Sequence, residues 1–289
     1  MADGNAGVET VNDIVLRAEV EQADLTALRD AYATIQGLPA TDNRSWLHWS
    51  GYHGFDQYDC WHHDRTGPGP GTLFPYDLFL PWHRAYLVSF EHILRDQNAA
   101  AVLPWWDWTS SASHQQGIPD AFAEPQVDGN DNPLASGPIP AIEGSPAGRT
   151  ERSPGNPGDL PSMTQTDPAL GPGLHSINYL LKLTSYVDFS NQLQNIHDAV
   201  HGWVGGSMGV VATSAFDPIF YSHHCMIDRI WYLWQLNHGP HNIPADYLDK
   251  VLAPFNYTVQ QVLDVRSLGY DYATSVAASA AGPSGAPTR

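Results

Sequence analysis

Histidines at helical spacing are the feature that most constrains how this chain can fold. It holds 14 histidines, more than its 13 lysines and arginines together. His197 and His201 lie four residues apart in a segment with helical periodicity, 189–203, so both imidazoles leave one helix face about one turn apart. That arrangement is a common way for one helix to give a metal ion two nitrogens. The alternative is two unrelated histidines at a chance spacing.

A second helical segment, 222–237, begins with the adjacent pair His223 and His224. Neighbouring residues on a helix diverge by about 100°, so we expect only one of the two to point into a given site. Asp228 follows His224 by four residues on the same face, and we expect it to accept a hydrogen bond that fixes the imidazole tautomer. The alternative is a surface aspartate.

A third helix is predicted to begin at Pro81, because proline is tolerated in the first turn, and it contains His83 and His92. Nine helical residues turn about 900°, which places these two histidines on opposite faces. We therefore predict His83 as a ligand and His92 as structural or exposed. Other histidines precede this helix, and each alone would more often be structural than functional: His48, His53, His62 and His63.

These groups together give two sets of three neutral imidazoles, which suits copper, zinc, iron or nickel. Two such sets on facing helices can hold a metal pair in a bundle core. The 25 glycines and 23 prolines indicate long irregular connections, above all over 55–80 and 111–175. We predict a mainly α fold: a four-helix-bundle core that holds a dinuclear metal site, with long irregular loops.

Charge and composition exclude several kinds of partner. With 31 acidic against 13 basic residues, the net charge of −18 argues against nucleic acid or an anionic membrane. The chain has no apolar run of about 18 residues, the length that a membrane span needs. Its start lacks the basic and apolar parts of a secretory signal, so we expect cytoplasmic residence unless processing or a partner leads to secretion. Two cysteines, Cys60 and Cys225, cannot make a disulfide framework.

Three long strings resemble the type 3 copper proteins, that is, tyrosinases, catechol oxidases and other polyphenol oxidases, and molluscan haemocyanins. They are FLPWHRAYLVSFE at 79–91, HDAVHGWVGGSMG at 197–209 and DPIFYSHHCMIDRIW at 217–231. The resemblance spans most of 11–272. It implies two copper ions, copper A and copper B, that bind O2 as peroxide.

The resemblance also implies a domain organisation. We expect one tyrosinase-like dicopper catalytic domain over 1–272 and a disordered low-complexity tail over 273–289. Gly269-Tyr270-Asp271-Tyr272 resembles the tyrosine motif that closes the family's catalytic domain. Arg17 is placed like the N-terminal arginine that packs near this motif.

In the family the second of the paired histidines binds copper B, which implies the ligand set His197, His201 and His224. For copper A the resemblance implies His83 as the third ligand and, from SWLHWSGYHG at 45–54, His53 as the first.

The second copper A ligand departs from the family pattern. Its usual place, about nine residues before the third ligand, is Phe74 here, but the chain offers Cys60-Trp-His62-His63. In fungal and molluscan members a C-x-H pair forms a thioether and its histidine binds copper. We therefore predict His62, with a Cys60–His62 thioether. His63 is the rival for this place, and His48 is a weaker substitute for His53.

The resemblance implies a copper-dependent oxidoreductase that uses O2 to oxidise o-diphenols, with monophenols as a further substrate class, to o-quinones. Asp198, after the first copper B histidine, corresponds to the family's residue that helps deprotonate the phenol. It could act as a base, repel phenolate, or be merely a solvated helix residue. Val211 matches the family's small residue at the copper B entrance, where it would leave room for substrate; the alternative is an ordinary buried valine.

Two other functions compete with the phenol oxidase. A haemocyanin-like O2-binding protein would have the same copper pair, but usually with a shielding domain, and only 17 residues follow Tyr272, which favours an enzyme. A separate small copper-delivery protein remains an expected partner. A dinuclear metallohydrolase would recruit bridging carboxylates, which these motifs do not offer.

Overall fold

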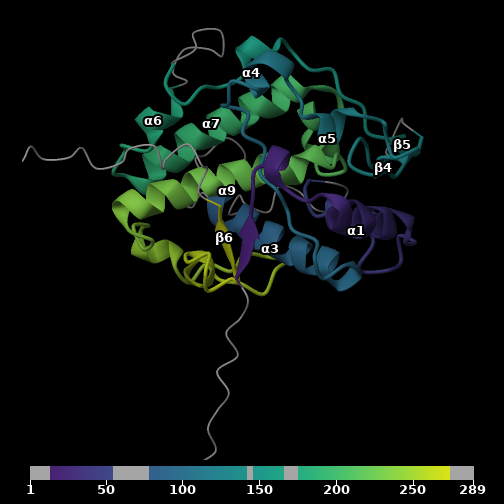
Figure 1. Cartoon of the computed structure of the whole chain (residues 1–289). Helices are drawn as coiled ribbons and strands as arrows, with labels where there is room; N and C mark the ends of the chain where they lie inside the picture. Colours follow the sequence, from purple (N-terminus) through teal and green to yellow (C-terminus); the bar gives the residue numbers. More distant parts are fainter. Residues whose placement is uncertain (1–13, 55–77, 142–145, 166–174, 274–289) are drawn as a thin grey trace, which may run out of the picture.

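The computed structural model describes residues 14–54, 78–141, 146–165 and 175–273, and these form a mainly helical fold, as predicted (Figure 1). Long helices α3 (Phe79–Gln97), α7 (Tyr186–Val204) and α9 (Ile219–His238) cross the centre, with α1 (Thr26–Gly37) at one side. The shorter helices are α2 (Trp46–Ser50), α4 (Ser113–Gln116), α5 (Asp120–Ala123), α6 (Ile177–Leu180) and α8 (Val211–Ser214). The expected tail over 273–289 lies outside the described residues, apart from its first.

Three two-stranded sheets complete the described fold. The segment 111–175, expected to be irregular, contains two antiparallel hairpins besides α4 and α5: β2 (Gln126–Val127) with β3 (Asn130–Asp131), and β4 (Pro138–Ile139) with β5 (Gly148–Arg149). In contrast, β1 (Val15–Arg17) pairs in parallel with β6 (Tyr270–Tyr272), with Arg17 opposite Tyr272. This pairing joins the two ends of the described chain.

Helix α7 has a defined beginning and end. The Ser185 side chain accepts a hydrogen bond from the backbone N–H of Asp188, which caps the first turn. The helix ends at Gly205, whose φ of +63° favours glycine and where a Cβ would lie 2.6 Å from Ser153 Oγ. The short 3₁₀ turn Gly206–Gly209 follows, and it brings the Met208 carbonyl back beside His201.

Helices α3 and α9 pack against each other through aromatic rings and a buried ion pair. Phe90 of α3 stacks on Tyr221 of α9 with ring centroids 3.9 Å apart. Arg84 Nε of α3 donates to Asp228 Oδ1 of α9 at 2.5 Å, and both side chains are buried. These contacts set the position of one helix along the other.

Asp228 also receives hydrogen bonds from both tyrosines of the closing motif. Tyr270 and Tyr272 donate to its Oδ2 at 2.6 and 2.5 Å, and Arg17 Nη1 lies 3.6 Å from the same oxygen. Arg17 packs on the Tyr270 ring, 3.8 Å from its centroid, which agrees with the placement that the family resemblance implied. Burial alone would raise the pKa of Asp228, but Arg84, Arg17 and the tyrosine hydroxyls together lower it.

The expectation that Asp228 orients His224 is wrong. Both carboxylate oxygens are taken by Arg84 and the two tyrosines, and His224 Nδ1 has no hydrogen-bond partner among the described residues. A buried carboxylate is stabilised far more by two arginines than by a neutral imidazole, so the cations decide where Asp228 points.

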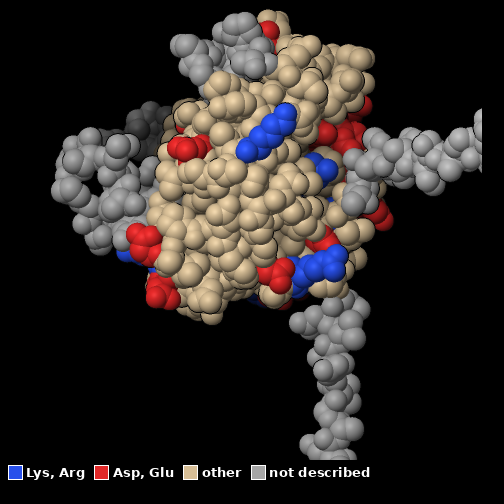
Figure 2. All heavy atoms as spheres, turned by 90° about the vertical axis from the view of Figure 1, so that its left-hand side faces the viewer, with Lys and Arg blue, Asp and Glu red and all other residues tan. Residues whose placement is uncertain are grey.

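The face drawn in Figure 2 carries few positive charges. On the face in Figure 2, the drawn lysines and arginines are few and separate, and most of the surface is uncharged. A basic stripe of the kind that tracks phosphates is absent among the coloured residues of this view. None of the described helices combines the length and the hydropathy that a bilayer span requires.

Replacing Asp228 by asparagine should lower the free energy of unfolding of the metal-free protein by about 3–5 kcal/mol, because buried Arg84 loses its counter-charge and Arg17 keeps only Glu91. Denaturant unfolding followed by circular dichroism measures the change. Asp96→Asn, at an exposed position of α3, is the control, with an expected change within about 0.5 kcal/mol. Equal stability of the two variants would show that the buried cluster contributes nothing.

Candidate metal centre

Histidines from four parts of the fold converge in the interior. They form two overlapping groups, and within each group one potential ligand atom per residue lies within 4.8 Å of the others. Helix α7 contributes two histidines, α9 two, α3 one, and the segment after α2 one. All are less than one-tenth exposed. The first group is His197, His201, His223 and His224, and the second is His53, His83 and His224.

The predicted copper B ligands have the spacing of a single metal site. His224 Nε2 lies 3.1 Å from His197 Nε2 and 3.3 Å from His201 Nε2. Imidazole nitrogens bind zinc at about 2.0–2.1 Å, so ligands of a tetrahedral ion lie about 3.3–3.4 Å apart. A metal of that size fits between the three nitrogens with little movement.

Hydrogen bonds to Nδ1 leave Nε2 available for a metal in several of these residues. A carbonyl or carboxylate oxygen can only accept, so the Nδ1 that it contacts carries the proton and Nε2 keeps its lone pair. This pattern is typical of metal-binding histidines. The contacts are His83 with Phe79 O at 2.8 Å, His201 with Met208 O at 2.8 Å, His53 with Val211 O at 3.3 Å and His197 with Asp198 Oδ1 at 2.9 Å.

Burial keeps four histidines of the two groups uncharged. Loss of solvent lowers the pKa of His53 to about 4, with a further contribution from neighbouring His197. Burial, reinforced by nearby imidazoles, lowers the pKa of His201, His223 and His224 well below 6.5. At neutral pH each of these imidazoles therefore has one nitrogen with a lone pair, which a metal can bind without displacing a proton.

The copper A prediction is described only in part. His53 and His83 lie together, with ring centroids 5.5 Å apart. Residues 60–63, which hold the predicted ligand His62, its rival His63 and the thioether candidate Cys60, lie outside the described residues, so the second ligand stays a prediction. His48 belongs to neither group, because its Nε2 contacts the Tyr52 hydroxyl at 2.9 Å. His92 is exposed and also belongs to neither group, in line with the expectation for it.

The expectation that only one of the paired histidines faces the site is wrong. His223 is fully buried, and its ring lies nearly parallel to that of His197 at 5.1 Å and 4.9 Å from that of His201. His224 packs between this group and His83, with the His83 and His224 rings stacked at 4.2 Å. Imidazoles lie on more than one side of the beginning of α9. The side chains of His223 and His224 therefore diverge but still both contact histidines from other helices.

Asp198 and Val211 lie where the cluster meets solvent. The Asp198 side chain is 65% exposed while its Oδ1 accepts from His197 Nδ1, so it orients that imidazole. Val211 is 54% exposed, which overturns its interpretation as an ordinary buried valine, and its carbonyl accepts from His53. The carbonyls of Phe79, Met208 and Val211 escaped sequence reasoning, because no side-chain type marks a backbone acceptor.

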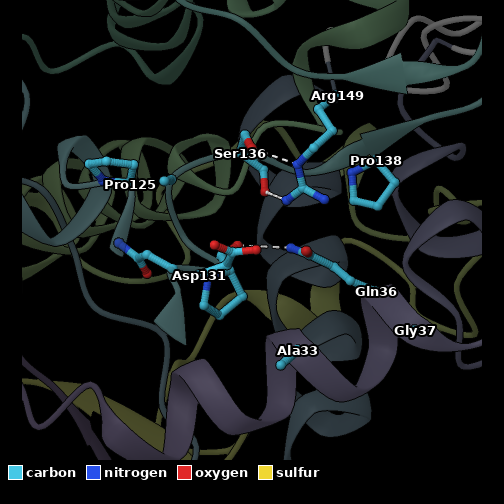
Figure 3. A pocket seen from close by; sticks show the side chains of 11 residues that line it. Ala33, Gln36, Gly37, Pro125, Asp131, Ser136, Pro138 and Arg149 are labelled. Atoms are coloured by element: carbon cyan, nitrogen blue, oxygen red, sulfur yellow. Dashed lines mark hydrogen bonds between the residues drawn. The ribbon is translucent and has the colours of Figure 1, made fainter. Parts of the chain in front are cut away.

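A separate surface cavity of about 420 Å³ lies between α1 and the segments that carry the two hairpins (Figure 3). Gln36 donates to Pro133 O, and Arg149 donates to Ser136 Oγ and O. Among the described residues that line this cavity there is no histidine or cysteine. It lacks the chemistry of the histidine cluster, which is therefore the better candidate site.

Comparisons with known proteins agree with this geometry. Residues 43–237 match the family model "Common central domain of tyrosinase". A tyrosinase from Streptomyces antibioticus is 34% identical over 224 residues, which cover 68% of this chain and 80% of that protein. Hemocyanin G-type, units Oda to Odg, from Enteroctopus dofleini is 33% identical over 199 residues, which cover 62% of this chain but 6% of that protein. A functional unit from octopus hemocyanin has a similar structure, with TM-score 0.67 and 26% identity over 90% of this chain and 68% of that chain.

Acid should destabilise the metal-free protein. The pKa of His53 is about 4 in the folded protein, against about 6.5 for a histidine exposed in the unfolded chain, so the unfolded chain takes up the proton first. The stability is complete above pH 6.5 and falls as the pH decreases toward 4, by about 3 kcal/mol from this residue alone. Urea unfolding at several pH values measures the slope. His53→Gln should flatten it and His92→Gln should not; equal slopes in all three proteins would contradict the account.

Proposed function

The chain belongs to the tyrosinase family, and we propose that it is a dicopper phenol oxidase that uses O2 to oxidise o-diphenols to o-quinones. Proteins of this family are dicopper oxidases or O2 carriers. The proposal chooses the oxidase and names its substrate class.

The donor set supports copper as the metal. Neither of the two described groups includes a carboxylate or a thiolate. Uncharged imidazoles suit copper, whereas hydrolytic metal pairs usually have oxygen-rich ligand sets with carboxylates. His197, His201 and His224 would hold copper B. His53 and His83 would hold copper A together with a third ligand, for which His62 is our proposal.

When bound, the copper pair supplies reversible electron acceptance and the binding of O2. Two o-diphenols lose four electrons and four protons to one O2, which gives two o-quinones and two waters. The protein's part is to hold the metal ligands and exclude water. Phe79 packs against His83 and His197 at 4.9 and 4.8 Å, and Phe220 packs against His53 and His224 at 4.8 and 4.0 Å. These apolar walls keep the imidazoles dry and suit a phenyl ring.

The exposure of two residues that contact the buried imidazoles supports an enzyme over a carrier. Asp198 and Val211 are both more than half exposed, yet each makes a hydrogen bond to a buried imidazole of a different metal group. We propose that a phenol approaches the metals from the side of the protein on which these two residues are exposed. Similarity to haemocyanin keeps O2 transport as the second candidate.

We assign Asp198 two roles at this entrance. Oδ1 orients His197, and Oδ2, for which the described residues provide no hydrogen-bond partner, would accept the phenolic proton of an incoming substrate. A base is needed most for monophenols, whose hydroxyl must lose its proton before the ring is hydroxylated. We propose diphenol oxidation as the main activity and monophenol hydroxylation as the Asp198-dependent one.

Oxygen uptake with catechol tests the proposed function. Copper-loaded protein should consume one O2 for every two catechols oxidised, and His201→Gln should lower the rate at least 100-fold, because one of the predicted copper B ligands is lost. An oxygen electrode and the quinone absorbance measure both quantities. Reversible O2 binding without any diphenol oxidation would instead identify a carrier.

Replacing Asp198 by asparagine should separate its two roles. The amide oxygen can still accept from His197 Nδ1, so copper content should stay the same, whereas loss of the base should lower the monophenol rate about 100-fold. The ratio of monophenol to diphenol rates is the readout. Asp188→Asn, at an exposed position in the first turn of the same helix, is the matched control. An unchanged ratio in Asp198→Asn would exclude the base role.

A further inference from the structure

His223 is the one member of the first histidine group to which the proposed copper pair gives no role. Its side chain is fully buried, and neither ring nitrogen has a hydrogen-bond partner of normal geometry among the described residues. The His197 backbone lies close enough to favour a proton on the ring. Trp108 packs at 6.3 Å without a hydrogen bond to it.

A buried imidazole without hydrogen-bond partners indicates a site for a bound ligand. A buried polar atom without a partner costs about 1–3 kcal/mol, so proteins rarely retain one without a reason. A neutral imidazole has one N–H and one lone pair. If the N–H turns to the His197 carbonyl, the other nitrogen keeps a lone pair that no donor among the described residues satisfies. His53, His83 and His201 show the same division, with one nitrogen at a backbone carbonyl and the other directed to the predicted metal site.

The position of His223 fits an additional ligand. One of its nitrogens lies within 4.8 Å of ligand atoms of His197, His201 and His224. Ligands of a tetrahedral ion lie about 3.3–3.4 Å apart, so side-chain rotation is enough to bring the fourth nitrogen to a shared ion. The ring of His223 is 5.2 Å from that of His224, close to the 5.1 Å that separates it from His197.

We propose that His197, His201, His223 and His224 form a four-imidazole site that binds the first copper ion before the second one is present. Four protein ligands close a metal site, whereas three leave a position open for chemistry. When the second ion binds beside His53 and His83, His223 withdraws, and the first ion stays on His197, His201 and His224. The half-loaded protein is then closed to O2, and only the complete pair is open. This inference rests on the proposed copper centre, not on the oxidation of phenols.

The experiment uses metal-free full-length protein and Co²⁺ as a spectroscopic probe, added up to one ion per chain. Four imidazoles around one Co²⁺ give the strong visible absorption of a tetrahedral ion, and X-ray absorption of the same sample counts the imidazoles. We expect four in the wild-type protein. Three imidazoles with an added water would overturn the proposal without any variant.

Variants provide the second readout. His223→Gln should lower the affinity for the first Co²⁺ at least tenfold and weaken the visible band, whereas exposed His92→Gln should change neither. At excess copper, His223→Gln should still bind two ions. Unchanged affinity and spectrum in folded His223→Gln would overturn the inference. A protein that binds its first ion through four imidazoles but oxidises no diphenol would contradict only the proposed function.

Discussion

Uncharged imidazoles packed into a water-poor interior are the constraint on which this structure depends. Charging His53, His201, His223 or His224 would place a cation in the interior among other imidazoles, so burial keeps these four neutral. Backbone carbonyls and Asp198 then fix which nitrogen carries the proton. The result is a set of nitrogen lone pairs directed to common points. A metal ion needs this arrangement, whereas a protein core without a metal ion gains nothing from it.

A separate cluster of buried charged side chains holds the histidines in place. Arg84 follows His83 in the chain, and Asp228 lies one turn after His224, so the Arg84–Asp228 pair joins α3 and α9 directly beside the predicted ligands. Tyr270, Tyr272 and Arg17 connect the same carboxylate to both ends of the described chain. Both ends of the described chain and helices α3 and α9 therefore contact the same charge cluster, and this cluster positions the histidines.

Sequence reasoning predicted what local geometry decides. The spacing of His197 and His201, the opposite faces of His83 and His92, and the mainly helical fold all follow from the helix period. It failed where tertiary packing decides. Asp228 turned to arginines from other segments, and His223 met imidazoles from α7. Backbone acceptors such as Met208 O are placed by the conformation of a turn, which no single side-chain type predicts.

The same centre can serve transport or catalysis, and what surrounds the imidazoles distinguishes the two. The central claim, however, is the metal pair itself. Crystals of copper-loaded protein, measured at the copper absorption edge, test it most directly. The account predicts two anomalous peaks per chain, one between His197, His201 and His224 and one beside His53 and His83. A single peak in fully loaded protein, or peaks away from these histidines, would contradict it.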